Sequence, residues 1–368
     1  MVRKSVLHIS TAHRALDTRI FHKECVSLSR AGFDVTVMAR HDRDEKVSGV
    51  RIIGLPTDRN RFIRMFFGPF RALYGALGQH VDVAHFHDLE LFPVMLALKA
   101  VGKKVVFDYH ENYTAQVMGK KYLGSDCVRM FIRTIVRRME KGIDRMADAV
   151  VAATDPISFL HDSPLKVTIN NFAILETIDR IAPAVVEKKR PVVVYSGALR
   201  ADRCIREIVG AMNRVGNEAE LWLMGAWSSP VFREECLGLS EKGNVKDLGF
   251  LDFETMYSFI KAGDVGIALS RPHGNSLEGQ PNKLFEYAAC GKPIITSDFL
   301  YRRKLLGEAA AYVDPLDPES IAYAILDVVR NPERAAATGR RGRLLTEERF
   351  SWESEARKLV DLYRTLVN

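Results

Sequence analysis

The stretch SVLHISTAHRALDTRIFHKECVSLSRAGFDVTVMAR, residues 5–40, decides the fold class. It opens with a short β-rich run, passes through a polar turn and ends in a second β-rich run at residues 34–40. Between the two runs, apolar residues recur at helical spacing up to the stop signal Gly32. This order predicts a βαβ unit, in which the two strands run parallel. A parallel sheet has helices on its faces, so residues 5–40 predict an α/β protein.

The alternation of strand and helix continues along the chain and restarts once. In the first half we predict further strands at 81–87, 104–110 and 149–154. In the second half we predict strands at 192–197, 220–225, 245–250, 264–269 and 293–298. Because 368 residues exceed what one hydrophobic core usually serves, we interpret the two series as two doubly wound domains.

The boundary between the domains has its own composition. The segment ETIDRIAPAVVEKKRP, residues 176–191, contains two prolines and a charge cluster, which is typical of a linker. We therefore predict an N-terminal domain over 1–175, a C-terminal domain over 192–350 and a terminal helix over 351–368. The terminal helix needs a hydrophobic partner for one apolar face. That face contains Ala356, Leu359, Val360, Tyr363, Leu366 and Val367.

Composition excludes several classes of protein. Hydrophobic residues make up 47% and charged residues 27%, which is typical of a compact globular protein. No apolar run approaches the roughly 20 residues of a membrane-spanning helix, and the first residues are too polar for a signal peptide, so we expect a cytoplasmic protein. The cysteines form no CxxC pair, which argues against disulfides and against a zinc site. We expect reduced thiols at Cys25, Cys127, Cys204, Cys236 and Cys290.

The net charge is concentrated in the first half of the chain. Residues 1–175 hold 26 Lys and Arg against 18 Asp and Glu, a balance of +8, whereas the remainder holds 27 against 28, a balance of −1. This asymmetry fits binding of nucleic acid or of an anionic membrane, and it also fits a solvated basic face.

Two basic stretches favour the membrane. Residues 120–141 hold seven basic residues against two acidic ones, and residues 59–78 hold no acidic residue. Basic residues are attracted to anionic lipid, and aromatic residues enter the headgroup boundary. The alternative is that the aromatic residues belong to the core. Within residues 59–78 the sequence interleaves Arg59, Arg61, Arg64 and Arg71 with Phe62, Met65, Phe66, Phe67 and Phe70.

The string EGQPNKLFEYAACGKPIITSD, residues 278–298, carries the sharpest chemical signal. Glu278 and Glu286 are separated by seven residues, and the sequence favours a helix that starts after Pro281. The N-terminus of that helix would present free N–H groups and a partial positive charge to a diphosphate. Each carboxylate could accept hydrogen bonds from a ribose or a sugar ring. The spacing alone also fits a helix with one favourable acid near its start.

This string resembles the E-x7-E segment of retaining glycosyltransferases of the GT-B fold, in the family 4 group that builds bacterial surface polysaccharides. Residues 17–40 resemble the N-terminal segment of a subgroup of these enzymes, and VVFDYHE at 105–111 resembles the strand that ends in their active-site histidine. The resemblance implies two Rossmann-like domains facing a cleft, with the acceptor on the first, the nucleotide sugar on the second and the terminal helix crossing back to the first.

The resemblance also implies roles for individual residues. Glu278 resembles the glutamate that holds the donor sugar, Glu286 the one that binds the ribose, and His110 the histidine near the transferred sugar. YSGALRADRC at 195–204 resembles a phosphate-binding loop, with Arg203 on its lysine position. Ala198 departs from the loop's arginine, and nearby Arg200 could supply that charge.

We therefore expect His110 and Glu278 to be catalytic. Gly225, in a stretch that resembles the surroundings of the nucleotide base, is expected to let a ligand approach the backbone. The full set of expected donor-binding residues is Arg200, Arg203, Gly225, Asn282, Lys283, Leu284 and Glu286. The acceptor-side candidates are Asp17, Arg19, His87 and Glu111.

We expect neither a metal nor a cofactor. Asp42 and Asp44 form a D-x-D pattern, but it lies in the mixed-charge stretch RHDRDEK, which is typical of a solvated loop. We interpret His85, His87 and Asp88 as cleft lining rather than as ligands. The expected donor is a UDP- or GDP-sugar, and the expected acceptor is a lipid-linked glycan at the inner face of the cytoplasmic membrane.

Three alternative functions compete with glycosyl transfer. Some GT-B enzymes epimerise or hydrolyse a sugar nucleotide, and turnover of donor without acceptor would indicate that class. A nicotinamide-dependent oxidoreductase is disfavoured because HISTAHRALDTR lacks the three glycines of the dinucleotide fingerprint. A non-catalytic nucleic-acid binder would show steep salt dependence, and we expect no nucleic-acid partner.

Overall fold

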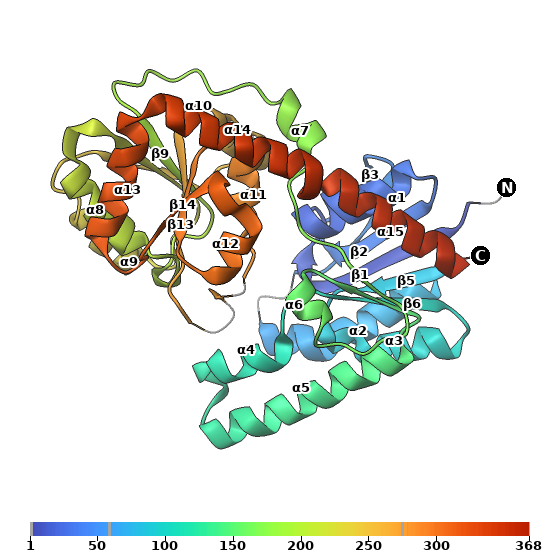
Figure 1. Ribbon diagram of the computed structural model, residues 1–368. Coiled ribbons are helices and arrows are strands. Elements are labelled where there is room, and N and C mark those ends of the chain that lie inside the picture. Colours follow the sequence, from blue (N-terminus) through green and yellow to red (C-terminus); the bar gives the residue numbers. More distant parts are fainter. Residues whose placement is uncertain (1–2, 58–59, 274–275, 278, 368) are drawn as a thin grey trace. The chain divides into compact units, whose positions relative to one another are not determined.

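The computed structural model describes residues 3–57, 60–273, 276–277 and 279–367. The chain divides into two compact units. The first consists of Met1–Asn171 with Trp352–Asn368, and the second of Phe172–Ser351. Each unit has a sheet covered by helices on both faces (Figure 1). The predicted pair of Rossmann-like domains is therefore confirmed.

The first unit contains an eight-stranded sheet in the order β3-β4-β2-β1-β5-β6-β7-β8. All neighbouring strands are parallel except the antiparallel pair β3 and β4 at one edge. The strands are β1 (Ser5–Arg14), β2 (Asp34–Arg40), β3 (Glu45–Val47), β4 (Val50–Leu55), β5 (Val83–Phe86), β6 (Lys104–Tyr109), β7 (Ala149–Ala152) and β8 (Lys166–Thr168).

The helices of the first unit include a π-helix, η1 (Thr18–Cys25), which continues directly into α1 (Val26–Arg30). The longer helices are α2 (Arg61–Leu77), α3 (Phe92–Ala100), α5 (Asp126–Met146) and α15 (Trp352–Val367). The shorter ones are η2 (Leu89–Leu91), α4 (Tyr113–Gly119), η3 (Lys121–Leu123) and α6 (Asp155–Ser158). No helix in the described ranges combines the length and the apolar character needed to cross a bilayer.

Side chains of the first sheet alternate between two helical layers. Leu7 and Ile9 of β1 pack in a hydrophobic cluster with residues of α2, α3 and α5. His8 lies on the opposite face, where it neighbours η1 and α15. His85 of β5 and Asp108 of β6 share that second face, because both contact residues of η1. One face of this sheet is therefore apolar and the other carries buried polar groups.

The second unit contains a fully parallel six-stranded sheet in the order β11-β10-β9-β12-β13-β14. Its strands are β9 (Val192–Ser196), β10 (Glu220–Met224), β11 (Val245–Gly249), β12 (Val265–Ala268), β13 (Ile294–Ser297) and β14 (Ala310–Val313). In chain order this is 3-2-1-4-5-6, the arrangement of dinucleotide-binding folds.

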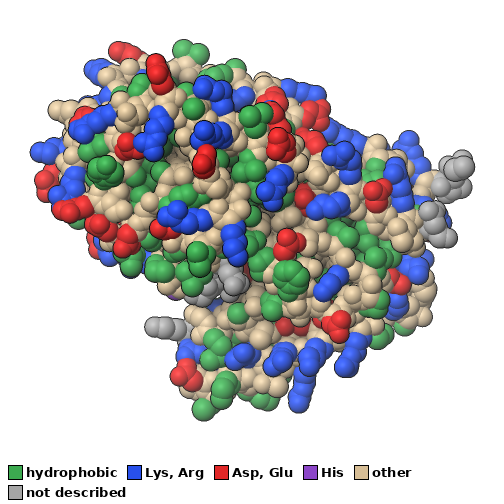
Figure 2. All heavy atoms as spheres, in the orientation of Figure 1, with side chains coloured by type: hydrophobic (Ala, Val, Ile, Leu, Met, Phe, Trp, Pro, Cys, Tyr) green, Lys and Arg blue, Asp and Glu red, His purple; other side chains and the backbone are tan. Residues whose placement is uncertain are grey.

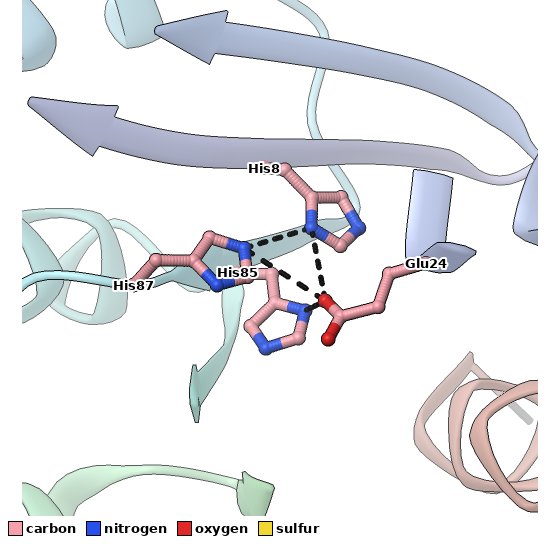
Figure 3. A group of neighbouring side chains, drawn as sticks. All are labelled: His8, Glu24, His85 and His87. Atoms are coloured by element: carbon pink, nitrogen blue, oxygen red, sulfur yellow. Dashed lines mark hydrogen bonds and ion pairs between the residues drawn. The ribbon is translucent and has the colours of Figure 1, made fainter. Parts of the chain in front are cut away.

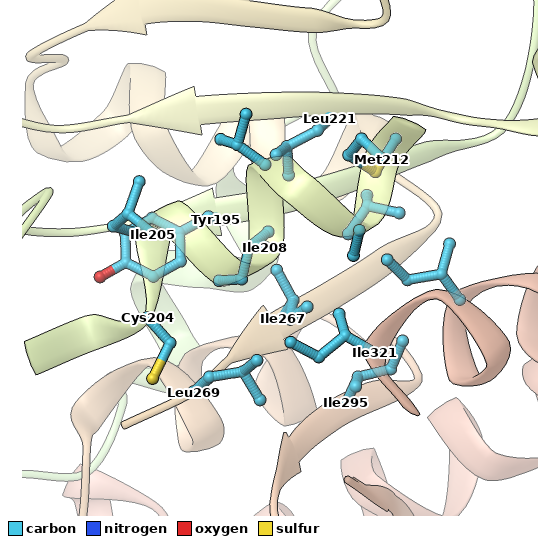
Figure 4. Packing of buried hydrophobic residues seen from close by; sticks show 14 of the residues in the cluster. Tyr195, Cys204, Ile205, Ile208, Met212, Leu221, Ile267, Leu269, Ile295 and Ile321 are labelled. Carbon is cyan, nitrogen blue, oxygen red and sulfur yellow. The ribbon is translucent and has the colours of Figure 1, made fainter. Parts of the chain in front are cut away.

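The helices of the second unit cover both faces of its sheet. Side chains from α8 and α13 pack against one face, as Ile208, Ile267 and Ile321 show in Figure 4. The helices are α7 (Leu175–Arg180), η4 (Ala201–Arg203), α8 (Ile205–Val215), η5 (Gly216–Glu218), α9 (Pro230–Gly238), α10 (Phe253–Ala262), α11 (Asn282–Ala289), α12 (Leu300–Leu306), η7 (Gly307–Ala309), α13 (Pro318–Arg330) and α14 (Pro332–Arg349).

The terminal helix α15 belongs to the first unit, which agrees with the expected return of the chain. Trp352 Nε1 donates a hydrogen bond to Ser27 Oγ at 3.0 Å. Glu355 Oε2 accepts one from the backbone N–H of Asn170 at 2.8 Å. Leu359 is fully buried. The helix is therefore attached to the first unit at its N-terminal end, and Leu359 of the predicted apolar face is buried at its centre.

The structure differs from the sequence prediction at the domain boundary. The division falls after residue 171 rather than 175, and residues 176–191 belong to the second unit rather than to a free linker. Ile178 of α7 is fully buried in the core of that unit. The predicted helix after residue 17 is a π-helix followed by an α-helix, because its hydrogen bonds skip five residues at its start.

Truncating Leu359 tests the attachment of α15. Leu359→Ala removes a fully buried side chain, so it should lower the free energy of unfolding of the first unit by about 2–5 kcal/mol. Trp352 reports on this unit alone when Trp222 and Trp227 of the second unit are changed to Phe. Denaturant unfolding followed by fluorescence makes the measurement.

The control is Arg357→Ala, which removes an exposed side chain from the same helix and should change stability by no more than about 0.5 kcal/mol. Equal unfolding midpoints for Leu359→Ala and the parent would contradict the assignment of α15 to the first unit.

Candidate functional site

In the second unit, two glycines bring the backbone close together where β9 and β10 end. Gly225 has φ +151°, and a Cβ at this position would lie 1.9 Å from the carbonyl oxygen of Gly197. Gly197 has φ +115° and follows β9 directly. Only glycine accommodates both the dihedral angle and the contact at position 225. Gly225 therefore lets the backbones that follow β9 and β10 approach each other, and the expected approach of a ligand at this position stays a prediction.

Two arginines share one hydroxyl beside these strand ends. Arg302 is fully buried and donates to Ser270 Oγ at 2.8 Å, while Arg203 donates to the same oxygen at 3.4 Å. Arg302 also donates to Thr296 Oγ1 at 2.9 Å and to the carbonyl of Ala268 at 3.1 Å. Among the described carboxylates, none forms an ion pair with Arg302. Burial and the charge of Arg203 lower the pKa of Arg302 to about 10.

Lys283 adds a third cation to this group. Its Nζ lies 3.8 Å from the centre of the Tyr195 ring, and a Cβ on Gly197 would lie 3.1 Å from the same atom. Burial, then the charge of Arg203, lowers the pKa of Lys283 to about 7, although Glu286 acts in the opposite direction. Cations that lower one another's pKa values form a site that favours an anion.

Helix α11 presents its N-terminus beside Lys283. The preceding Pro281 provides no side-chain cap for the helix. Asn282 is exposed, whereas the Leu284 side chain is fully buried in the core and its N–H donates to the Pro281 carbonyl. The Leu284 side chain therefore supports the helix from inside and does not face a ligand. Uncapped N–H groups at this end favour negative charge.

The remaining donor-side candidates have different surroundings. Glu286 lies beside Tyr257, whose pKa is raised well above its ordinary value by burial and then by the Glu286 charge. Arg200 forms two hydrogen bonds to Asp202, at 2.9 and 3.1 Å, so its charge is already paired. Glu278 lies outside the described residues.

In the first unit, the polar face of the sheet carries a chain of histidines. His110 follows β6, and its Nε2 lies 3.2 Å from His87 Nδ1 and 3.3 Å from Asp108 Oδ2. His87 Nε2 lies 3.0 Å from His8 Nδ1. The His110 side chain is 16% exposed, whereas His8, His87 and Asp108 are fully buried. Burial lowers the pKa of His110 to about 3, because it outweighs the nearby Asp108.

The buried acid Asp108 is held by an arginine from the π-helix. Arg19 Nε and NH2 each donate to Asp108 at 3.0 Å, and NH1 donates to the carbonyl of Ile169 at 2.8 Å. Asp17 begins the π-helix, where its carboxylate accepts from the N–H groups of Arg19 and Ile20. The acceptor-side candidates Arg19 and His87 are thus interior groups that support His110, and Asp17 is a helix cap.

Asp88 forms hydrogen bonds with the C-terminal part of β1. Its Oδ2 accepts from Ser10 Oγ at 2.8 Å and from the N–H groups of Thr11 and Ala12 at 2.6 and 3.0 Å. His13 Nδ1 lies 3.5 Å from Asp88 Oδ1. Although burial acts against it, the hydrogen bond and charge of Asp88 raise the pKa of His13. Asp88 therefore fixes the C-terminal part of β1.

The structure corrects one interpretation from the sequence and shows the surroundings of other residues named there. His85, His87 and Asp88 do not line a surface, because all three are buried in the first unit. Asp44 accepts a hydrogen bond from the Gly54 N–H at 2.8 Å within an exposed loop, as expected of the D-x-D pattern. Glu111 is exposed. The expected free thiols are confirmed.

Three residues that contribute to these groups were not predicted from the sequence. Arg302 comes from a helix beyond the E-x7-E string, and nothing in its spacing links it to Arg203. His8 and Glu24 lie far from His87 in the sequence. The H-F-H pattern at 85–87 places His85 and His87 on one face, because residues two apart on a strand share a face, but it does not point to His8.

Two family models match the chain. Residues 190–331 match the model described as glycosyl transferases group 1, and residues 19–158 match the model described as glycosyltransferase family 4. The GDP-mannose-dependent monoacylated alpha-(1-6)-phosphatidylinositol monomannoside mannosyltransferase of Corynebacterium glutamicum is 28% identical over 125 residues, 33% of either chain. A GDP-mannose-dependent alpha-(1-6)-phosphatidylinositol monomannoside mannosyltransferase of Mycolicibacterium smegmatis is 30% identical over 95 residues, 25% of either chain. The matches thus span a third or less of these relatives.

Solved structures resemble the chain over its whole length. Sucrose-phosphate synthase from Thermosynechococcus elongatus aligns with a TM-score of 0.75 and 21% identity, covering 99% of both chains. The HepE protein of Anabaena, in complex with UDP and glucose, aligns with a TM-score of 0.71 and 12% identity, covering 99% of this chain and 100% of that one. At such low identity the likeness shows the fold alone, which is the predicted GT-B fold.

The pKa of Lys283 predicts a pH dependence of diphosphate binding. In the free protein Lys283 is protonated below pH about 7, and a bound diphosphate stabilises that charged form. The affinity for UDP or GDP should therefore be highest below this pH and fall as the pH rises above it, by up to about tenfold per unit. Calorimetric titration between pH about 7 and 9 makes the measurement.

Lys283→Arg keeps its charge throughout this range, so its affinity should depend less on pH than that of the parent. Parallel affinity curves for the two proteins would contradict a titrating lysine in the site.

Proposed function

Because the chain belongs to the group 1, family 4 glycosyltransferases, we propose that it transfers a sugar from a UDP- or GDP-sugar to an acceptor with retention of configuration. The second unit binds the donor and the first binds the acceptor. The observation that carries this proposal is the group of Arg203, Lys283 and Arg302 at the strand ends, with Ser270 shared by the two arginines. Asp202 lies 3.8 Å from Arg203, whereas Arg302 has no ion-pair partner among the described carboxylates, and a diphosphate would supply the further negative charge.

The proposed chemistry follows from the charge that develops during transfer. The transition state is oxocarbenium-like, and negative charge grows on the leaving diphosphate. Arg203, Lys283 and the N-terminal N–H groups of α11 stabilise that charge, which is the main electrostatic contribution to catalysis. Arg302 acts through Ser270 and Arg203, because its guanidinium is fully buried. No metal ion is needed for this step.

Retention requires attack on the face from which the diphosphate leaves. In this proposal the leaving phosphate accepts the proton of the acceptor hydroxyl, so no side chain acts as a nucleophile. Glu278 holds hydroxyls of the donor sugar, Glu286 binds the ribose, and His110 hydrogen-bonds near the transferred sugar. Asp108 and His87 fix the orientation of His110.

Three substitutions test the donor site. Glu286→Ala should weaken binding of UDP or GDP about tenfold or more, because it removes hydrogen bonds to a charged group. Glu278→Ala should mainly lower kcat, and Arg203→Ala should weaken binding and lower kcat by about a hundredfold. Binding is measured by calorimetry and turnover by release of nucleotide. We also expect activity to persist in EDTA.

The matched control is Arg206→Ala, since Arg206 is a neighbouring arginine on α8 that pairs with Glu235. It should leave binding and turnover unchanged. Parent-like kinetics in all three donor-site variants would exclude the assignment. Turnover of the donor without any acceptor would indicate an epimerase or hydrolase. If EDTA abolished activity and only Mg²⁺ or Mn²⁺ restored it, Asp42 and Asp44 would become candidate metal ligands.

We further propose a lipid-linked acceptor, reached by peripheral binding at the inner face of the cytoplasmic membrane. Two relatives are named as mannosyltransferases that act on a phosphatidylinositol monomannoside, which is a lipid. Support from this chain comes from α2, where the aromatic side chains are exposed rather than in the core. Their exposed fractions are 78% for Phe62, 66% for Phe66, 50% for Phe67, 64% for Phe70 and 86% for Tyr74.

Helix α5 of the same unit also exposes aromatic and basic side chains. Phe131 is 67% exposed, and Arg133, Arg137 and Arg138 are exposed nearby on the helix. Figure 2 shows Lys and Arg side chains together with hydrophobic side chains along the lower edge of the first unit, over α5. Such a surface combines attraction to anionic headgroups with aromatic insertion.

Vesicle binding tests the membrane proposal. The double substitution Phe66→Ser with Phe70→Ser removes exposed aromatic rings, so it should lower the salt-resistant part of binding to vesicles that contain anionic lipid. Arg133→Glu with Arg137→Glu should lower the salt-sensitive part, because each basic residue contributes about 1 kcal/mol. Cosedimentation at low and high salt measures both.

Phe250→Ser is the control, since Phe250 of the second unit is 79% exposed and lies outside this surface. It should bind vesicles as the parent does. If the parent ignores anionic vesicles at low salt, or if the arginine variant binds as well as the parent, a soluble acceptor replaces the lipid-linked one.

A further inference from the structure

A buried cluster in the first unit has the chemistry of a metal site. Figure 3 shows that His8 of β1, His85 of β5 and the adjacent His87 direct ring nitrogens toward the carboxylate of Glu24. All four side chains are fully buried. They come from two neighbouring strands and from the π-helix that covers them. Imidazole and carboxylate are ligands that Zn²⁺ accepts in proteins.

The distances within the cluster are close to those of a tetrahedral site. Glu24 Oε2 lies 3.8 Å from His8 Nδ1, 4.0 Å from His85 Nδ1 and 4.0 Å from His87 Nε2. All four ligand atoms lie within 4.8 Å of one another. In a tetrahedral zinc site with bonds of about 2.05 Å, ligand atoms are about 3.3 Å apart. Small side-chain movements would bring four ligands to bonding distance of one ion.

The cluster also contains polar atoms that its described neighbours leave without hydrogen bonds. Neither carboxylate oxygen of Glu24 accepts a hydrogen bond from a described group. His8 Nε2 and His85 Nε2 also have no described partner, but the nitrogens that face Glu24 are the Nδ1 atoms, so only the Glu24 oxygens bear on an ion at this point. Arg19 Nε approaches Glu24 Oε1 at 3.1 Å, but as an ion pair without hydrogen-bond geometry. A buried carboxylate without donors is costly unless a cation compensates it.

The surroundings of His87 match those of a metal-binding histidine. Its Nδ1 lies 3.4 Å from Asp108 Oδ2, and Asp108 is itself fixed by Arg19. With its proton on Nδ1, which pairs with His110 Nε2 at 3.2 Å and faces Asp108, His87 has its Nε2 lone pair directed toward His8 and Glu24. Metal-binding histidines commonly use their second ring nitrogen as a hydrogen-bond donor in this way.

We propose that the first unit holds one divalent transition-metal ion, Zn²⁺ by the chemistry of its ligands, between His8, Glu24, His85 and His87. Four protein ligands in a closed interior leave no open position, so the ion is structural and takes no part in the transfer step. It joins β1, β5 and the π-helix at one point.

Charge alone does not select a metal over a proton. If Glu24 and Asp108 are both ionised, their charges and that of the neighbouring Arg19 sum to −1, which a proton on Glu24 changes to zero and a divalent ion changes to +1. Coordination decides between them, because one proton satisfies one atom of Glu24 whereas a metal takes lone pairs from four ligands at once. Tyr363 Oη, 2.8 Å from His85 Nδ1, gives up that hydrogen bond when the metal binds.

The ion would also affect the orientation of His110, through the His87 ring that lies between them. His87 binds the metal through Nε2, and its Nδ1 lies 3.2 Å from His110 Nε2. Fixing the His87 ring therefore fixes the group against which His110 packs. Metal binding makes His87 a positioning residue for His110.

The test measures metal in the full-length protein, expressed with added Zn²⁺ and purified without chelator. Mass spectrometry of the elements should find about one equivalent of metal per chain, because a closed site retains its ion. Protein expressed with Co²⁺ instead should show the visible absorption of tetrahedral cobalt. Both readouts are independent of transferase activity, so their results test the metal site separately from the proposed function.

Glu24→Gln and His8→Ala each remove a ligand and should lower the metal content about tenfold or more. The matched control is His161→Ala, since His161 is a buried histidine of the same unit that lies beside Asp144, outside the cluster. This control should keep the metal. Circular dichroism checks that each variant is folded.

Two results would overturn the proposal. One is background metal content in the parent after growth with either ion. The other is parent-like metal content in folded Glu24→Gln protein. The first result needs no variant, so it decides the question even if the Glu24→Gln chain fails to fold.

Discussion

The buried pair of Arg19 and Asp108 organises the polar face of the first unit. Two hydrogen bonds of 3.0 Å join them, and both side chains are removed from solvent. Loss of either partner would leave an uncompensated charge, at a cost of about 3–5 kcal/mol. Asp108 orients His87 and His110, and Arg19 accompanies Glu24, so each polar group on this face depends on the pair directly or through one neighbour.

The two units use buried charge in opposite ways. In the first, an arginine finds its acid inside the same unit, and the histidines around it are held neutral by burial. In the second, Arg302 and Lys283 are buried beside Arg203 without a matching acid for Arg302 among the described residues. The first arrangement gives a rigid interior, whereas the second keeps electrostatic energy that only an anionic ligand relieves.

Much of the fold was predictable because buried parallel strands are continuous apolar runs. All strands predicted from such runs exist, and the missed ones, β3, β4, β8 and β14, are short or lie near the sheet edges where the pattern is weaker. The π-helix was not predictable from apolar spacing, since its first residues repeat differently from an α-helix. The backbone freedom of glycine drew the prediction to Gly225, where the structure has a close backbone approach. Arg302 and Glu24 reach their sites through tertiary packing that no local pattern encodes.

The return of α15 has a consequence for how the chain is made. The second unit is one continuous insertion, entered and left side by side at the bridge between Ala173 and Ser351. It can therefore finish folding as soon as it has left the ribosome, since domains fold as units during synthesis. The first unit cannot, because the surface that receives Leu359 and Tyr363 stays uncovered until α15 emerges. The domain begun first is therefore completed after the domain inserted within it.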